Sequence, residues 1–213
     1  MHDFERGIYR QGFRFIAGID EAGRGPLAGP VVAAAVILPP NYKNPEIADS
    51  KRLAPNKREK LYEIIKAEAI SFGIGVVEAH IIDKINILRA SLKAMEEAVK
   101  ELNPSPDYLL IDGLNSLPLP YPQKTIVKGD SLSISIAAAS IIAKVSRDRI
   151  MEIYHRQFSQ YNFRKNKGYP TAEHREALKK YGPCKLHRLS FNLEGKIKRR
   201  ESYFFFEDDY AQG

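Results

Sequence analysis

The sequence predicts an α/β protein in which a mixed five-stranded sheet is flanked by helices. Short apolar segments bounded by glycine, proline or acidic residues are typical of buried strands. Such segments cover residues 15–19, 31–38, 70–77, 107–113 and 125–127. An acidic, glycine-containing turn joins the first two, as in a hairpin, whereas helical segments join the later ones. This order of connections is typical of a mixed sheet covered by helices.

Four longer segments are predicted helices. They cover residues 55–69, 79–102, 131–161 and 171–181. The first two have apolar residues spaced at threes and fours, as amphipathic helices do. The third begins with the uncharged stretch ISIAAASIIA, so its first half is expected to be buried, while its second half is charged. A basic loop is expected over residues 163–170.

The composition is that of a globular protein with one sizeable core, since 44% of the 213 residues are hydrophobic. The N-terminal residues lack the apolar stretch of a signal peptide, and no segment is long and apolar enough to cross a bilayer. Cys184 is the only cysteine, which excludes an internal disulfide and a cysteine-based zinc site. These features predict a cytoplasmic protein without membrane contact.

The net charge of +7 is unevenly distributed along the chain. Residues 144–200 hold 16 basic and 5 acidic residues, whereas residues 1–143 hold 17 of each. A basic block of this kind suits a polyanionic partner such as nucleic acid. The alternative is an ordinary solvated face rich in lysine and arginine.

Four acidic residues lie at or just after the ends of three predicted strands: Asp20, Glu21, Asp112 and Asp130. Strands of one sheet can bring their ends together. Buried carboxylates that meet there would repel each other, and Mg²⁺ or Mn²⁺ would remove that penalty because hard cations prefer oxygen ligands. Two such ions about 3.5–4 Å apart would form a phosphodiester-cleaving site. The alternatives are solvated turn residues for the first three acids and a helix N-cap for Asp130.

Several of these segments resemble the signatures of ribonuclease HII, the type 2 ribonucleases H, in its bacterial form. The first is GIDEAGRGPLAGPVVAAAV over residues 18–36. The others are Asp49-Ser50-Lys51, LIDG at 110–113, KGD at 128–130, AAASIIAKVSRDR at 137–149, KGYPT at 167–171 and LHRLSF at 186–191. The resemblance covers roughly residues 14–191.

The resemblance implies a ribonuclease H-like fold with a small helical C-terminal extension. It implies a catalytic domain over residues 1–191 and a tail over 192–213 that packs on the domain or extends from it. The implied activity is hydrolysis of RNA in RNA–DNA hybrids and incision on the 5′ side of single ribonucleotides in duplex DNA. Two Mg²⁺ or Mn²⁺ ions would take part, leaving 3′-hydroxyl and 5′-phosphate ends.

The resemblance also implies roles for individual residues. Asp20, Glu21 and Asp112 would be metal ligands, with Asp130 as the fourth acid. The segment Gly23-Arg24-Gly25 would contact the ribonucleotide and its phosphate. Tyr169 would pack on the sugar that follows, and Lys51 would approach the backbone. By family analogy, the protein would contact a sliding clamp; we expect a monomer.

Other basic residues are candidates for contacts with the nucleic-acid backbone. Lys144 and Arg147 lie on a predicted helix, where a structural role is an equal alternative. Arg164, Lys165 and Lys167 belong to the basic loop, which favours phosphate contacts.

Three other functions are compatible with parts of the sequence. A resolvase-like nuclease of the same fold would share the acids but not the dependence on a ribonucleotide. A non-catalytic nucleic-acid-binding module would use only the basic block. A nucleotide-binding enzyme is weakest, because GRGPLAG matches neither common phosphate-binding glycine motif.

Overall fold

The computed structural model describes residues 3–47 and 54–193. Its five strands are β1 (Ile16–Ala22), β2 (Val31–Ile37), β3 (Ser71–Val77), β4 (Tyr108–Asp112) and β5 (Gln123–Ile126). They form one sheet in the order β3-β2-β1-β4-β5. β2 is antiparallel to both of its neighbours, whereas β1, β4 and β5 are parallel. The predicted mixed five-stranded sheet is therefore confirmed.

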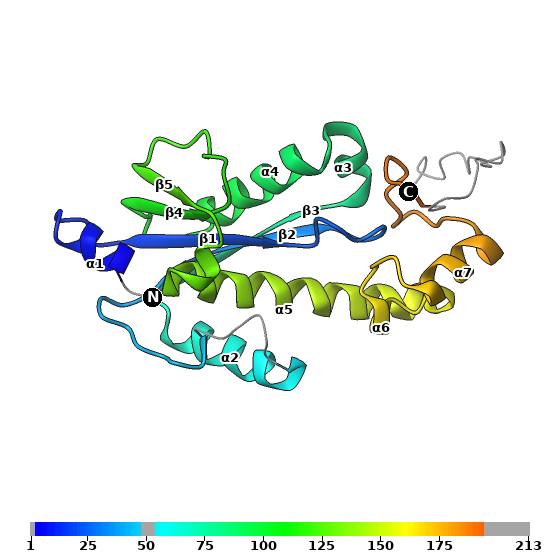
Figure 1. The fold of residues 1–213 in the computed structure, drawn as a ribbon, viewed down its shortest axis with the longest axis horizontal. Coiled ribbons are helices and arrows are strands. Elements are labelled where there is room, and N and C mark those ends of the chain that lie inside the picture. The colour runs from blue at the N-terminus through cyan, green and yellow to red at the C-terminus, as the bar shows by residue number, and fades with distance from the viewer. Residues whose placement is uncertain (1–2, 48–53, 194–213) are drawn as a thin grey trace, which may run out of the picture.

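Helices cover both faces of this sheet. They are α1 (Asp3–Tyr9), α2 (Pro55–Glu68), α3 (Ala79–Ile85), α4 (Ile87–Lys100), α5 (Ile134–Gln157), α6 (Phe163–Asn166) and α7 (Ala172–Tyr181), with short 3-10 helices η2 (Gly129–Ser131) and η3 (Ser159–Tyr161). Figure 1 shows α3 and α4 above the sheet and α5 below it, with α2 beneath α5. The small helices α6 and α7 lie beyond the sheet at the far end of α5.

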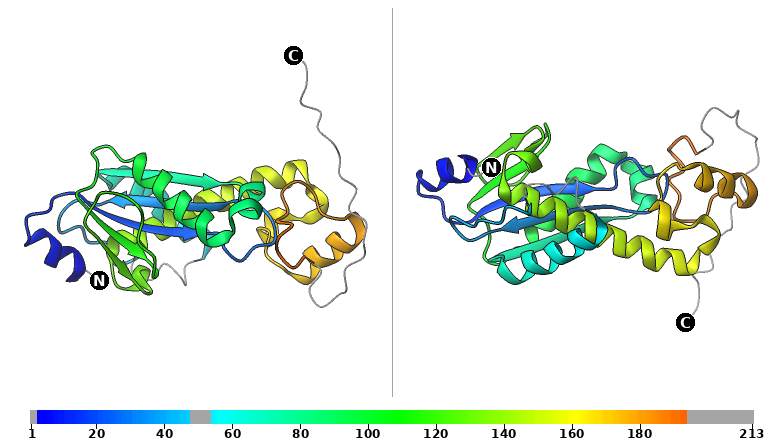
Figure 2. Two further views of the ribbon diagram at one scale, coloured as in Figure 1. Left: turned by 90° about the horizontal axis from the view of Figure 1, so that it is seen from above. Right: turned by 60° about the horizontal axis from the view of Figure 1, so that its bottom comes forward.

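The alternation of side chains along β1 and β2 explains these two layers. Ala17, Ile19 and Ala33 are buried toward α4, while Ala34 and Val36 are buried toward α5 and α2. Gly18 lies on the α5 face, where a Cβ atom would collide with the backbone of the first turn of α5. This close approach seats α5 directly against the central strand (Figure 2). Because side chains alternate with a period of two, Asp20 also belongs to the α5 face.

Two predicted helices differ from the structure. The helix expected over residues 79–102 is broken at Asn86, whose φ is 68° and whose side chain accepts a hydrogen bond from Arg89 N at 3.1 Å. The helix expected over 131–161 begins only at Ile134 and is followed by η3. Its N-cap is Ser133, so the N-cap role considered for Asp130 is wrong. The basic loop contains the one-turn helix α6.

The helix α1 was not expected from the sequence. It packs against the start of α5 because Glu5 is buried and accepts hydrogen bonds from Ser133 Oγ at 2.5 Å and Ser135 N at 3.2 Å. Within the described ranges, no helix is long and apolar enough to cross a membrane. Most of the predicted tail, residues 192–213, lies outside the described residues.

Candidate active site

The candidate acids gather at one edge of the sheet. β1 and β4 are adjacent parallel strands that pair in register through Ile19 and Ile111, so Asp20 and Asp112 occupy the next aligned positions. Asp20 and Glu21 lie within the last residues of β1 rather than in a solvated turn, and Asp112 is the last residue of β4. The structure thus brings together acids that are about ninety residues apart in sequence.

Asp130 reaches the same edge through a backbone contact. The backbone N–H of Gly129 donates a hydrogen bond to Asp112 Oδ1 at 2.6 Å, which ties η2 to the end of β4. Asp130 is the next residue and is only 3% exposed. All four acids predicted from the sequence therefore belong to this edge, which we call the acidic edge (Asp20, Glu21, Asp112 and Asp130).

Burial and mutual repulsion shape the electrostatics of the acidic edge. Asp20 is 6% exposed, and its pKa is raised well above the usual value by burial and then by the nearby charges of Glu21 and Asp112. Burial also raises the pKa of Glu21, although Arg24 opposes that shift. Ionised carboxylates at this edge destabilise the protein, and a bound cation would offset that destabilisation by its attraction to them.

Some oxygens of the acidic edge already have partners within the protein. Asp20 Oδ1 accepts a hydrogen bond from Glu21 N at 2.7 Å, and Glu21 Oε1 pairs with the guanidinium of Arg24 at 3.1 Å. Among residues 3–47 and 54–193, no three His, Cys, Asp or Glu side chains form a preassembled metal cage. The donor set nevertheless fits Mg²⁺ or Mn²⁺, because it consists of carboxylate oxygens and includes a buried carboxylate that its neighbours repel.

A cavity of about 440 Å³ opens beside the acidic edge. Its lining includes Glu21, the segment 23–25, Lys144 and Tyr169, which come from three distant parts of the chain. Tyr169 is 42% exposed, and its ring lies near Gly25, with the ammonium of Lys144 6.0 Å from the ring centre. The glycine segment and the tyrosine that the sequence suggested for substrate binding therefore lie on the walls of one cavity.

Two further polar residues line this cavity and were missed by the sequence analysis. Arg58 belongs to the charged run KREK at the start of α2, which resembles an ordinary solvated helix face. Ser140 interrupts the apolar first half of α5, and its hydroxyl is hydrogen-bonded to Asp20, which lowers the pKa of that carboxyl. A lone polar residue within a buried helical stretch was the available signal for Ser140.

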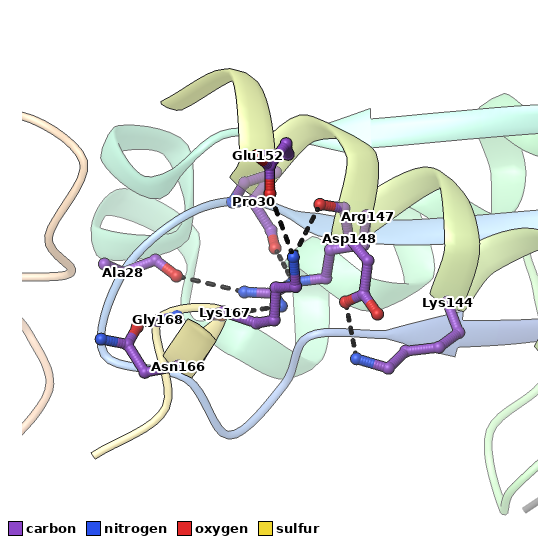
Figure 3. Close-up of polar contacts among 9 residues, drawn as sticks. All are labelled: Ala28, Pro30, Lys144, Arg147, Asp148, Glu152, Asn166, Lys167 and Gly168. Atoms are coloured by element: carbon purple, nitrogen blue, oxygen red, sulfur yellow. Dashed lines mark hydrogen bonds and ion pairs between the residues drawn. The ribbon is translucent and has the colours of Figure 1, made fainter. Parts of the chain in front are cut away.

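Arg147 does not fit its predicted contact with nucleic acid. It is 1% exposed, and its guanidinium donates hydrogen bonds to three backbone carbonyls inside the protein (Figure 3). Arg164 and Lys165 are well exposed and pair with Glu152 and Glu173 respectively, so backbone contact stays a prediction for them.

Lys144 and Lys167 are less exposed. Lys144 pairs with Asp148 at 2.6 Å, and Lys167 lies 3.8 Å from Glu152, so neither is an unengaged cation. Lys51 lies outside the described residues, and its predicted contact is untested.

Comparison with solved structures defines the class of protein. The ribonuclease H2 from Pyrococcus horikoshii OT3 matches with a TM-score of 0.72 and 26% identity, covering 85% of this chain and 96% of that one. The ribonuclease HII of Archaeoglobus fulgidus, solved in complex with PCNA, matches with a TM-score of 0.71 and 25% identity, covering 89% and 98%. The fold is that of a ribonuclease H, and the protein is a hydrolase of this class.

Sequence comparison identifies the family. The family model described as Ribonuclease HII matches residues 17–194. The ribonuclease HII of Syntrophus aciditrophicus (strain SB) is 67% identical over 194 residues, which are 91% of this chain and 92% of that relative. The chain belongs to the ribonuclease HII family, and the predicted family and fold are confirmed.

Proposed function

We propose that this ribonuclease H hydrolyses the RNA strand of RNA–DNA hybrids and incises duplex DNA on the 5′ side of single embedded ribonucleotides. The observation that carries the proposal is the cavity beside the acidic edge. It places a glycine segment able to approach a sugar closely and an exposed aromatic ring next to buried carboxylates. The products would be a 3′-hydroxyl and a 5′-phosphate.

The acidic edge is the proposed reaction centre. Asp20, Glu21 and Asp112 would hold divalent cations, with Asp130 as the fourth acid. Two bound Mg²⁺ or Mn²⁺ ions would supply activation of the attacking water and stabilisation of the leaving 3′-oxygen. Ser140 would keep the Asp20 carboxylate oriented through its hydroxyl.

The glycine segment is the proposed reader of the 2′-hydroxyl. That hydroxyl is what distinguishes a ribonucleotide from its deoxyribonucleotide neighbours, and reading it requires groups within hydrogen-bond distance. Gly23 has a φ of 101°, a backbone conformation that favours glycine, and Gly25 lacks a Cβ on the side facing Tyr169. Arg24, whose side chain is half exposed, would turn from Glu21 toward a phosphate.

Tyr169 is the proposed selector of the sugar that follows the ribonucleotide. A ring packed on the adjacent deoxyribose leaves no room for a second 2′-hydroxyl. The exposed ring lies across from the glycine segment in the cavity, which is the placement this role requires. Together the two walls would recognise the junction between one ribonucleotide and DNA.

Cleavage of defined duplexes tests the proposal. The substrates are a DNA duplex with one ribonucleotide, the same duplex of DNA alone and an RNA–DNA hybrid, each incubated with Mg²⁺, Mn²⁺ or EDTA. We expect metal-dependent nicking at the ribonucleotide and in the hybrid, and none with Asp112→Asn. Equal nicking of the all-DNA duplex would instead support a resolvase-like nuclease. Binding without cutting would leave only a nucleic-acid-binding module.

Contact with a sliding clamp is a second element of the proposal. The Archaeoglobus relative was solved in complex with PCNA, and it covers most of this chain. The segment Phe204-Phe205-Phe206, which lies outside the described residues, is the candidate for this contact, and the alternative is that it packs on the domain. Deleting residues 201–213 should abolish co-elution with a sliding clamp while leaving cleavage of a short duplex unchanged. Co-elution that survives the deletion would place the contact elsewhere.

A further inference from the structure

Two arginines are buried behind the cavity without an acidic partner. Arg147 on α5 is 1% exposed, and Arg188 in the segment after α7 is 0% exposed. In the described part of the chain, no carboxylate lies within ion-pair distance of either guanidinium. Burial of a cation in this way is costly unless its donors are fully used.

Arg147 joins the two walls of the cavity. Its Nε donates a hydrogen bond to Pro30 O at 2.9 Å and its Nη2 donates one to Ala28 O at 3.1 Å, both in the connection between β1 and β2. Its Nη1 donates a hydrogen bond to Lys167 O at 3.0 Å, two residues before Tyr169. Figure 3 shows this guanidinium lying between the two segments, reached from α5.

Arg188 holds the glycine segment itself. Its Nη2 donates hydrogen bonds to Gly23 O at 2.6 Å and Gly29 O at 2.8 Å, and its Nη1 donates one to Arg24 O at 3.0 Å. The backbone beside Arg188 is fixed in turn, because Asp83 on α3 accepts hydrogen bonds from the N–H groups of residues 189 and 190 at 2.9 Å. Arg188 therefore links the glycine segment to α3, which covers the face of the sheet opposite to α5. Its guanidinium holds the glycine segment, and the backbone next to it is held by Asp83.

The two walls also pack closely against each other and against Arg147. A Cβ atom on Gly23 would collide with the guanidinium of Arg147, and one on Gly168 would collide with Ala28 O. The backbone N–H of Leu27 also donates a hydrogen bond to Gly168 O at 2.8 Å. The spacing between the glycine segment and the tyrosine is thus set by contacts that centre on these arginines.

We propose that Arg147 and Arg188 are positioning residues that fix the separation between the backbone of the 23–25 segment and Tyr169, and so set the preference for a ribonucleotide followed by a deoxyribonucleotide. This inference rests on the proposed function. Neither side chain touches the substrate; each acts through the backbone it holds. Burial lowers the pKa of both guanidiniums, and the charge of Arg147 lowers that of Arg188 further.

The variants Arg147→Lys and Arg188→Lys test this role. Lysine keeps the charge but cannot reproduce the planar fork that donates to several carbonyls at once. The readout is kcat/KM on a duplex with one ribonucleotide and on an all-RNA hybrid, measured where circular dichroism shows each variant fully folded. The matched control is Arg149→Lys, because Arg149 lies on the same helix but pairs with Glu59 and Glu63 at the surface.

We expect kcat/KM on the single-ribonucleotide duplex to fall by about tenfold to hundredfold, the usual effect of a misplaced binding group. Cleavage of the hybrid should fall by less, because the sugar after its cleaved position carries a 2′-hydroxyl and gives Tyr169 no deoxyribose to pack on. The ratio of the two values would therefore change in these variants and stay constant in Arg149→Lys.

An unchanged ratio in the folded arginine variants would overturn the proposal, whether or not overall activity falls. Should either variant fail to fold, Gly168→Ala provides a second test, because it pushes the walls apart without altering a charge. It should lower the same ratio, and an unchanged ratio in folded Gly168→Ala would equally overturn the proposal. Wild-type protein that does not cut at a single ribonucleotide would refute the proposed function instead.

Discussion

Replacing Asp112 with asparagine should stabilise the metal-free protein while abolishing its catalytic activity. Asp112 raises the pKa of the buried Asp20, which means that the two carboxylates repel each other when both are ionised. Asparagine removes that repulsion and keeps an oxygen that can accept the hydrogen bond from Gly129 N. A residue that we propose acts in catalysis would thus destabilise the metal-free fold.

The magnitude follows from the strand pairing. Asp20 and Asp112 follow the aligned pair Ile19 and Ile111 on adjacent strands, which lie about 4.8 Å apart in sheets. Two unit charges at about 4.8 Å repel by about 3.5 kcal/mol at an effective dielectric constant of about 20. Partial protonation of Asp20 and the weaker hydrogen bond to a neutral amide reduce the gain to about 1–2 kcal/mol. For a chain of this size, the melting temperature should rise by about 2–8 °C.

Thermal melting in EDTA and in Mg²⁺ measures this effect. Mg²⁺ should stabilise the wild type, by about 2.7 kcal/mol at a hundred times its Kd, and should stabilise Asp112→Asn much less. Asp107→Asn is the matched control, because Asp107 lies just before the start of β4 and accepts hydrogen bonds from the N–H groups of Arg14 and Phe15. This control should lose stability in both conditions. Lower stability of Asp112→Asn in EDTA, or an Mg²⁺ shift equal to that of wild type, would refute the reasoning.

Three further predictions concern other parts of the structure. The raised pKa of Asp20 means that the folded protein binds a proton at this carboxyl more tightly than the unfolded chain does. The resulting stabilisation in EDTA is full below about pH 4 and is lost as the pH rises through the raised pKa. Asp20→Asn should therefore flatten the dependence of melting temperature on pH, and an unaltered slope would contradict this. Gly18→Ala should cost about 3 kcal/mol in urea denaturation because it forces α5 away from β1, whereas Gly7→Ala, with open space around it, should cost nothing. Tyr169→Ala should lower kcat/KM on a single-ribonucleotide duplex by roughly tenfold to hundredfold, the loss expected for a stacking ring. The control Tyr181→Ala, which removes an exposed tyrosine at the end of α7, should leave kcat/KM unchanged. Equal effects of the two substitutions would refute the proposed role of Tyr169.

The sheet and its acidic edge could be predicted because their signals are local. Each strand is a short apolar segment, and the structure places all five within a few residues of the predicted bounds. The acids stand at the ends of those segments, so strand pairing alone brings Asp20 and Asp112 together. The extension of β1 through Glu21 to Ala22 was unexpected, since charged residues seldom continue a buried strand. The start of β5 at Gln123, two residues before the predicted one, was also unexpected.

Features that depend on distant contacts could not be predicted from local pattern. The break at Asn86 interrupts a regular apolar spacing, and nothing in that spacing indicates a positive φ. Arg147 lies between Lys144 and Arg149 in a charged part of its helix, yet it is buried and donates hydrogen bonds to the carbonyls of residues 28, 30 and 167. His174 and His187 form a buried contact of 3.1 Å between their Nε2 atoms, which a separation of thirteen positions in the sequence does not reveal.

The length of α5 has a consequence for how this enzyme family can vary. Ser140 beside the acidic edge and Arg147 behind the tyrosine wall belong to the same uninterrupted helix, seven residues and about 10 Å of rise apart. This segment acts as a ruler between the proposed reaction centre and the wall that we propose selects the next sugar. Loops around the sheet can gain or lose residues without changing the distance between Ser140 and Arg147 along α5. One residue inserted within the ruler would turn its far end by about 100° and remove the register between cutting and recognition.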